Sequence, residues 1–213
     1  SGITFLTNQS DTHTMRVVVA SGNPGKFKEI VALLEGLEVL LVPLDRVGPV
    51  EVPPEGGDSF QENARLKAES VAQATRLVTI ADDSGLEVDA LGGKPGVLSA
   101  RFGGSDRSDE ERNRLLLDNL QGVPPERRTA RFRCVVAIAE PAGPVHMAEG
   151  TCEGRIAMAP RGTHGFGYDP VFEIPTLGRT MAEVEPELKN RLSHRAQAMR
   201  HARTLLEELG SRR

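Results

Sequence analysis

Short apolar runs alternate with amphipathic stretches along the first half of the chain. Residues 16–21 and 77–81 are short, largely apolar runs with the length and composition of buried strands. Apolar side chains recur every three or four residues at 27–34 and again at 60–72, which predicts two helices. Residues 38–42 form a further predicted strand. This order of strands and helices predicts an α/β fold.

The second half of the chain predicts a different arrangement. Residues 131–140 and 145–157 are long strand-like runs separated by a Pro-Ala-Gly-Pro turn, a pattern typical of an antiparallel hairpin. Helices are predicted to begin at Ser108 and at about Ser193, because either serine can cap a first turn. Residues 86–90 are expected to continue extended after a short break in the preceding strand. Together the two halves predict a mixed sheet with flanking helices.

The ends of this pattern predict the domain organisation. The first 14 residues are polar and weakly patterned, whereas Met15 begins a clear strand pattern. We therefore expect residues 1–14 to be a tag remnant or a loose leader. Residues 15–213 carry no internal repeat or long linker and are expected to form a single catalytic domain.

Charge and composition exclude several classes of function. The 213 residues include 26 Lys and Arg against 30 Asp and Glu, a net charge of −4, so no nucleic-acid partner is expected. No apolar run approaches the ~18 residues of a membrane span and no signal peptide is evident, so we expect a cytoplasmic protein without a membrane partner. Cys134 and Cys152 lie in apolar stretches and are expected to be reduced core residues.

A candidate phosphate-binding loop follows the first predicted strand. Residues 21–26 read Ser-Gly-Asn-Pro-Gly-Lys and open a predicted helix. Exposed N–H groups and the positive end of the helix dipole suit phosphate there, and Lys26 adds a positive charge. The spacing is too short for a Walker A loop and Phe27 stands where Ser or Thr would bind magnesium, which disfavours a P-loop kinase. An ordinary strand–turn–helix connection is the alternative.

Two adjacent carboxylates, Asp82 and Asp83, end the apolar run at 77–81. Ligand sites form at strand ends in α/β sheets, and Mg²⁺ takes one or two carboxylates together with substrate phosphates. Neighbouring strand residues point in opposite directions, so the two acids are expected to have different roles. Glu55, in an irregular loop, could supply another metal ligand. A polar turn is the alternative, because Asp-Ser-Gly is ordinary turn composition.

Residues 165–170 read Gly-Phe-Gly-Tyr-Asp-Pro in a chain with 4% aromatic residues and one tyrosine. Glycines on both sides let a ring stand clear of the backbone, where it can stack on a nucleobase. The alternative is a turn whose two rings fill the core.

Cationic residues begin the last predicted helix. His194 and Arg195 follow the predicted cap Ser193, where positive charge is unfavourable against the helix dipole. This position indicates an anionic or polar ligand, although a surface His-Arg pair is the alternative. Lys67, alone on its predicted helix, is interpreted from the pattern as a surface lysine.

Six segments taken together resemble the inosine triphosphate pyrophosphatase (Ham1-like) family of non-standard purine nucleoside-triphosphate pyrophosphatases. In chain order they are residues 21–29, 60–68, 81–91, 95–102, 165–172 and 189–198. The resemblance implies a Mg²⁺-dependent homodimeric enzyme. Its reaction would be hydrolysis of ITP, dITP and XTP to the monophosphate and pyrophosphate, which clears them from the nucleotide pool. The resemblance also implies an elongated mixed sheet in two lobes with the substrate cleft between them.

The resemblance further implies roles for individual residues. Asp83 matches the proton acceptor and, with Glu55, the metal ligands, while Lys26 and Lys67 match catalytic contacts to the triphosphate. Phe166 matches the base-stacking ring. The substrate-binding positions that the resemblance carries over are Ser21, Gly22, Asn23, Pro24, Gly25, Lys26, Ser84, Phe166, Gly167, Tyr168, Asp169, Lys189, His194 and Arg195.

Two other functions stay open at this stage. One is a related nucleotide pyrophosphatase with another base preference, as in the similarly folded Maf-like proteins. The other is a non-catalytic nucleotide-binding module, which would not need the Asp82–Asp83 pair. Acyl-transfer chemistry is disfavoured, because no Ser-His-Asp or Cys-His arrangement is evident.

Overall fold

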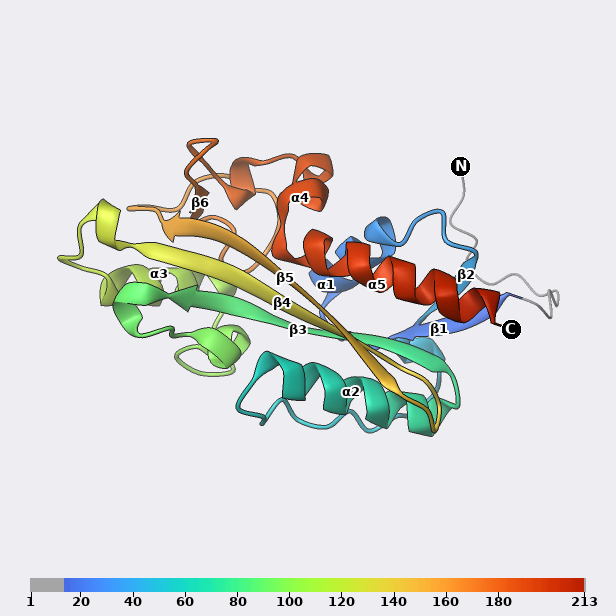
Figure 1. Cartoon of the computed structure of the whole chain (residues 1–213). Coiled ribbons are helices and arrows are strands. Elements are labelled where there is room, and N and C mark those ends of the chain that lie inside the picture. Colours follow the sequence, from blue (N-terminus) through green and yellow to red (C-terminus); the bar gives the residue numbers. More distant parts are fainter. Residues whose placement is uncertain (1–13, 213) are drawn as a thin grey trace.

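A computed structural model describes residues 14–212 of the chain (Figure 1). The predicted leader at 1–14 lies, apart from Thr14, outside the described residues. The strands are β1 (Met15–Val19), β2 (Val39–Pro43), β3 (Val78–Val88), β4 (Thr129–Ala139), β5 (Val145–Ile156), β6 (Phe172–Ile174) and β7 (Arg179–Thr180). The α-helices are α1 (Pro24–Leu33), α2 (Phe60–Thr75), α3 (Asp109–Asn119), α4 (Pro186–Leu192) and α5 (His194–Ser211).

These strands form one mixed sheet in the order β2-β1-β3-β4-β5-β6-β7. β1 lies parallel to both β2 and β3, and the remaining pairs are antiparallel. β4 and β5 are the two arms of the predicted hairpin. The long strands β3, β4 and β5 run through the length of an elongated molecule (Figure 1). The predicted α/β class, with an elongated mixed sheet and flanking helices, is confirmed.

The prediction of a break after residue 81 is wrong, because β3 continues through Asp82 and Asp83. Its pairing with β4 extends from Thr79 to Val88, and backbone hydrogen bonds of this kind do not depend on side-chain polarity. On its other side, β1 pairs only with Val78–Ile80. In the described part of the chain, residues 81–86 of β3 therefore have no strand partner along this edge.

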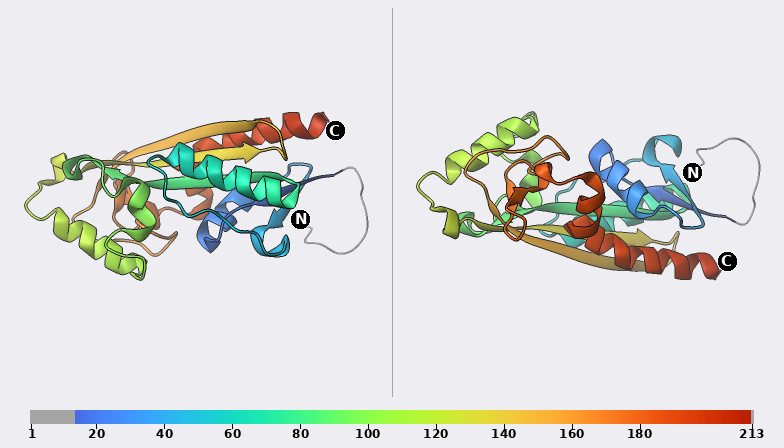
Figure 2. Two further views of the ribbon diagram at one scale, coloured as in Figure 1. Left: turned by 90° about the horizontal axis from the view of Figure 1, so that it is seen from below. Right: turned by 90° about the horizontal axis from the view of Figure 1, so that it is seen from above.

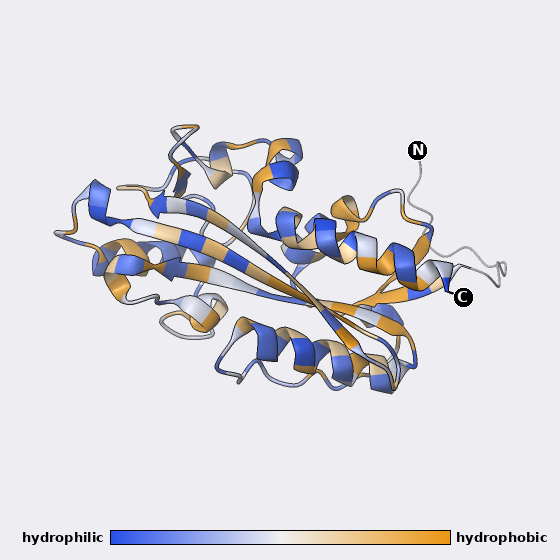
Figure 3. Ribbon diagram, viewed as in Figure 1, coloured by the Kyte–Doolittle hydropathy of each residue, from blue (hydrophilic) through white to orange (hydrophobic). Residues whose placement is uncertain are grey.

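Helices cover both faces of the sheet. Alternate residues of β1 point to opposite sides: Val17 packs with α1 and α5, and Val18 packs with α2. Seen from below, α2 lies in front of the sheet, and seen from above α5 does (Figure 2). Along α2 and α5 apolar residues alternate with polar ones, as in helices that bury one face (Figure 3). A third core cluster, which includes Leu86, Leu116 and Phe172, fills the other end of the sheet near α3.

Both cysteines lie in these cores as predicted. Cys134 and Cys152 are buried and free, and burial raises the pKa of the Cys134 thiol to about 12. No helix in residues 14–212 is both long and apolar enough to cross a membrane.

The contact between α5 and β5 gives a stability prediction. A methyl group at Gly150 would lie 2.6 Å from the backbone nitrogen of Ala198 and also against the His194 carbonyl. Gly150→Ala should therefore lower the free energy of unfolding by about 1–3 kcal/mol, because α5 must move outward. Urea denaturation measures this. Gly56→Ala is the control, since a methyl group there is 3.9 Å from its nearest neighbour, Pro54 O. An unchanged stability of Gly150→Ala would contradict this close packing.

Candidate active site

The unpaired edge of β3 meets the beginning of α1. β1 ends where its pairing with β3 ends, and the chain then turns through residues 21–23 into the helix. The side chain of Asn23 caps α1 by accepting a hydrogen bond from the Lys26 N–H at 3.0 Å. The Lys26 Nζ lies 3.3 Å from Asp82 Oδ2. The predicted loop therefore brings a helix N-terminus and a lysine beside the two acids, an arrangement suited to phosphate.

Asp82 is buried on the side of the sheet that carries α1 and α5. Its Oδ2 lies 3.3 Å from Lys26 and 3.2 Å from the Arg195 guanidinium. Burial by itself raises the pKa of Asp82, but Lys26 and Arg195 outweigh it and hold the pKa well below its usual range. Asp82 therefore stays ionised and holds two cations in place.

Asp83 points to the opposite side, as the strand alternation predicts. Its Oδ2 accepts from Asn63 Nδ2 of α2 at 2.9 Å, and its Oδ1 accepts from the Ser84 N–H at 2.9 Å. Burial raises the pKa of Asp83 above its ordinary value, against the opposing charge of Lys26. A carboxylate with a raised pKa is a better proton acceptor than an ordinary aspartate.

Lys67 is buried rather than on the surface, so the interpretation of its pattern is wrong. Its ammonium group pairs with Glu55 and donates to the Asp82 carbonyl at 3.1 Å. Burial by itself lowers the pKa of Lys67, but Glu55 outweighs it, so the pKa is raised and the ammonium stays charged. Asn63 and Lys67 are four residues apart and share the face of α2 that lies over β3.

Sequence reasoning assigned no role to Glu29, which lies at the centre of a buried ion-pair network. Its two carboxylate oxygens lie 2.6 Å from the Lys189 ammonium and 2.5 Å from the Arg195 guanidinium. Lys189 also pairs with Asp169 at 2.5 Å, and Asp169 accepts the Phe166 N–H at 3.0 Å. Glu29 follows Lys26 by three residues, so the two side chains lie about one helical turn apart on the same face of the helix. This spacing was the signal in the sequence that could have assigned Glu29 to the site.

The two aromatic rings of the 165–170 loop have different environments. The Phe166 ring is half-buried, with the Lys189 Nζ 4.8 Å and the Arg195 guanidinium 5.8 Å from its centroid. It packs against Gly25, where a methyl group would lie 2.6 Å from the ring. The Tyr168 ring is buried and its hydroxyl donates to the Ser99 carbonyl at 2.7 Å. Of the two, Phe166 is placed to meet a ligand and Tyr168 fills the core.

His194 and Arg195 begin α5 behind the predicted cap Ser193, which accepts from the Ala196 N–H at 3.1 Å. The sequence indicates an anionic or polar ligand at Arg195. In the structure, two carboxylates of the protein itself, Glu29 and Asp82, pair with its guanidinium. Arg195 also donates to Ser84 Oγ at 2.9 Å.

His194 is buried and stacked on Phe132, with ring centroids 4.7 Å apart. Its Nδ1 is buried without a hydrogen-bond partner among the described residues. Burial lowers the pKa of His194 well below its usual value, so the ring is neutral. An unpaired buried ring nitrogen of this kind can recognise a polar ligand.

Two carboxylates, Asp83 and Glu55, are the candidate oxygen donors for a metal ion at this edge. Within residues 14–212, no three His, Cys, Asp or Glu side chains form a cluster that could hold a metal ion by themselves. Asp83 and Glu55 lie near enough for the negative charge of Glu55 to contribute to the raised pKa of Asp83. Two carboxylates with substrate phosphates are the ligands that Mg²⁺ takes. The residues present therefore fit an ion that arrives with an anionic substrate.

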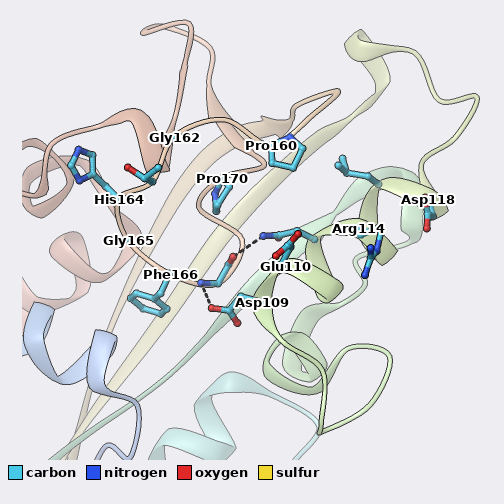
Figure 4. A pocket seen from close by; sticks show the side chains of 14 residues that line it. Asp109, Glu110, Arg114, Asp118, Pro160, Gly162, His164, Gly165, Phe166 and Pro170 are labelled. Atoms are coloured by element: carbon cyan, nitrogen blue, oxygen red, sulfur yellow. Dashed lines mark hydrogen bonds between the residues drawn. The ribbon is translucent and has the colours of Figure 1, made fainter.

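Two cavities flank the acids and do not include them. One, of about 780 Å³, lies between the first loop and the segment after β2, and Ser21, Gly22, Asn23 and Pro24 line it. The other, of about 650 Å³, lies between α3 and the 160–170 segment, and Phe166 and Gly167 line it (Figure 4).

The fold and the site together define an α/β protein with the features of a phosphate-handling enzyme: a helix N-terminus, cations and two acids at one strand edge. The Ham1 family model matches residues 17–205, and the chain belongs to this family.

Relatives of known name agree with this assignment. The chain is 52% identical to a dITP/XTP pyrophosphatase of Geobacillus kaustophilus, over 86% of this chain and 90% of the relative. A HAM1 protein from Coxiella burnetii has a similar structure, with a TM-score of 0.84, 41% identity, and coverage of 92% of this chain and 100% of that one. A nucleoside-triphosphatase / dITP/XTP pyrophosphatase from Mycobacterium abscessus aligns with a TM-score of 0.72 at 44% identity, over 88% of this chain and 98% of that one.

The buried neutral imidazole of His194 gives a pH prediction. Its pKa is lowered in the folded protein, so the unfolded chain takes up the proton first as the pH falls below the ordinary value of about 6.5. As the pH falls from about 7.5 to about 5.5, protonation of this histidine in the unfolded chain should therefore lower the free energy of unfolding by about 1.4 kcal/mol. Urea denaturation at both pH values measures this.

The control for that measurement is a second histidine of the same helix. His194→Gln should reduce the pH dependence by this amount, whereas replacement of the exposed His201 should leave it unchanged. Equal pH dependence in wild type and His194→Gln would contradict the prediction.

Proposed function

We propose that this chain hydrolyses dITP, XTP and ITP to the nucleoside monophosphate and pyrophosphate, and so clears non-standard purines from the nucleotide pool. The observation that carries the proposal is that Lys26 and Lys67 both contact Asp82 at the unpaired edge of β3 and lie near enough to Asp83 for their charges to act on its pKa. Cations there suit a triphosphate, and the carboxylate beside them suits the activation of water. Relatives named dITP/XTP pyrophosphatase support the choice of substrates.

In the proposed reaction, water attacks the α-phosphorus and pyrophosphate leaves. The Asp83 carboxylate accepts the proton of the attacking water, and its raised pKa favours this transfer. The ammonium groups of Lys26 and Lys67 and the N-terminus of α1 stabilise the charge that develops on the phosphate oxygens. Asn63 holds Asp83 in position.

Asp83 and Glu55 would hold Mg²⁺. Bound there with the substrate, the ion supplies positive charge to the phosphate oxygens. Lys67 pairs with Glu55 and donates to the Asp82 carbonyl, so one side chain fixes both the loop acid and the strand.

Base selection in the proposal depends on Phe166 and on the first residues of α5. Phe166 would stack on the purine, beside Lys189 and Arg195. Hypoxanthine and xanthine carry a 6-oxo acceptor where adenine carries a 6-amino donor. Donors from the His194–Arg195 region, side chain or backbone, would pair with the oxo group and leave adenine mismatched, a difference that can reach about 10⁴-fold when the site is buried.

Two further proposals come with this function. A nucleotide-pool enzyme acts where nucleotides are made and used, so we place it in the cytoplasm. We also propose that the protein forms a homodimer, as the family resemblance implies.

A product assay with Mg²⁺ tests the function. With dITP, XTP and ITP we expect the monophosphate and pyrophosphate, and catalytic efficiencies at least about 100-fold higher than with ATP. Equal turnover of all purines, GTP included, would keep the reaction and overturn the selectivity. Orthophosphate as the first product would contradict attack at the α-phosphorus, and binding without turnover would favour a nucleotide-binding module.

The proton-acceptor role of Asp83 predicts a specific loss. Asp83→Asn keeps the shape of the side chain and removes the basic oxygen, so kcat for dITP should fall by about 10²–10⁴. Asp118→Asn, which changes an exposed acid on α3, is the matched control and should retain wild-type turnover. Near wild-type kcat in Asp83→Asn would exclude Asp83 as the base.

A further inference from the structure

The backbone of the 165–170 loop is held from outside by α3. The Gly167 N–H donates to Asp109 Oδ2 at 2.8 Å, and the Gly167 carbonyl accepts from Asn113 Nδ2 at 3.0 Å (Figure 4). Asp109 and Asn113 are four residues apart and therefore lie on one face of α3. Both hydrogen-bonding groups of a single glycine are thus fixed by side chains of one helix.

This glycine needs such an anchor because of its conformation. Gly165 and Gly167 both have positive φ, +75° and +61°, a region that residues with side chains rarely adopt. Phe166 lies between them, so the ring is flanked on both sides by residues with no side chain to restrict the backbone. On its N-terminal side, Asp169 holds the Phe166 N–H at 3.0 Å. The contacts to α3 provide the corresponding restraint on the C-terminal side.

Packing does not replace these hydrogen bonds. The cavity of about 650 Å³ between α3 and the loop is lined by Asp109, Asn113, Phe166 and Gly167, so side chains do not fill this side of the loop. The position of Gly167 relative to α3 therefore depends on the two polar contacts.

The start of α3, which carries the anchor, is capped. Ser108 and Glu111 form a capping box at the start of α3, which fixes the first turn that carries Asp109. Asn113 is 4% exposed, and its Nδ2 points to the Gly167 carbonyl.

We propose that Asp109 and Asn113 are positioning residues for the base-stacking ring. They fix the backbone of Gly167, and through it they hold the Phe166 ring beside Lys189 and Arg195. The inference rests on the proposed function, because it assigns these residues to base recognition by the same site. They act through Phe166 and do not touch the substrate.

Steady-state kinetics with dITP test the inference through a double-mutant cycle. Phe166→Ala should raise KM by about 10-fold or more through loss of stacking. Asp109→Ala should raise KM by about 3- to 10-fold and change kcat by less than about 2-fold. In the Phe166→Ala background, Asp109→Ala should have no further effect, because its contribution passes through the ring.

Two variants of α3 serve as controls. Asp109→Asn keeps an oxygen that can accept the Gly167 N–H and should restore a KM near that of wild type. Glu110→Ala removes the neighbouring acid from the same helical turn, with a similar loss of favourable interaction with the helix dipole, and should leave KM unchanged.

A fluorescence measurement reports the loop directly. The chain contains no tryptophan, so Phe166→Trp introduces a single indole at the ring position. Adding Asp109→Ala to this protein should increase acrylamide quenching and lower the anisotropy of the indole, whereas adding Glu110→Ala should change neither.

The outcomes separate this inference from the proposed function. Suppose that Phe166→Ala raises KM. If Asp109→Ala then leaves the indole signal unaltered, or if the two substitutions have additive effects on KM, the inference is overturned and the function is kept. An unchanged KM for Phe166→Ala overturns the stacking role and the inference with it. Absence of pyrophosphate release by the wild-type protein overturns the function itself.

Discussion

The buried ion pair between Asp82 and Arg195 is the contact on which the site depends. Each residue is 1% exposed, so two full charges lie out of water. Such a pair is favourable only when further partners compensate for the lost hydration. Lys26 supplies a second cation to Asp82, and Glu29 supplies a second carboxylate to Arg195. This requirement joins β3, α1 and α5, which lie far apart in the sequence.

The same ion pairs continue from Lys26 of the first loop to the Phe166 loop, the two ends that the proposed function assigns to phosphate and base. Cations and carboxylates alternate in the order Lys26, Asp82, Arg195, Glu29, Lys189 and Asp169, and the last accepts the Phe166 N–H. A displacement of any member would remove one of the partners that compensate a neighbouring charge for its lost hydration. The network therefore fixes the spacing between the lysine of the first loop and the aromatic ring, as the proposed nucleotide site requires.

Strand geometry explains how two adjacent acids serve different purposes. Side chains alternate across β3, so Asp82 points toward the buried cations and Asp83 toward α2. The first is held ionised by its partners, and the second has its pKa raised by burial. Because β1 is shorter than β3, this edge is unpaired and leaves room for the start of α1.

Local pattern determined β1, β2, the first part of β3, the β4–β5 hairpin, the buried cysteines and the cap at Ser193, because each depends on residues within a few positions of one another. The alternation of Asp82 and Asp83 followed for the same reason. Local pattern did not predict the short strands β6 and β7 or the unbroken course of β3. Only the tertiary structure showed that Lys67 is buried, that Glu29 bridges two cations and that α3 anchors Gly167. These facts depend on contacts between segments distant in the sequence: 166 positions separate Glu29 from Arg195, and 54 separate Asn113 from Gly167. Local periodicity records which face of an element is apolar, but it carries no information about which distant charge meets that face.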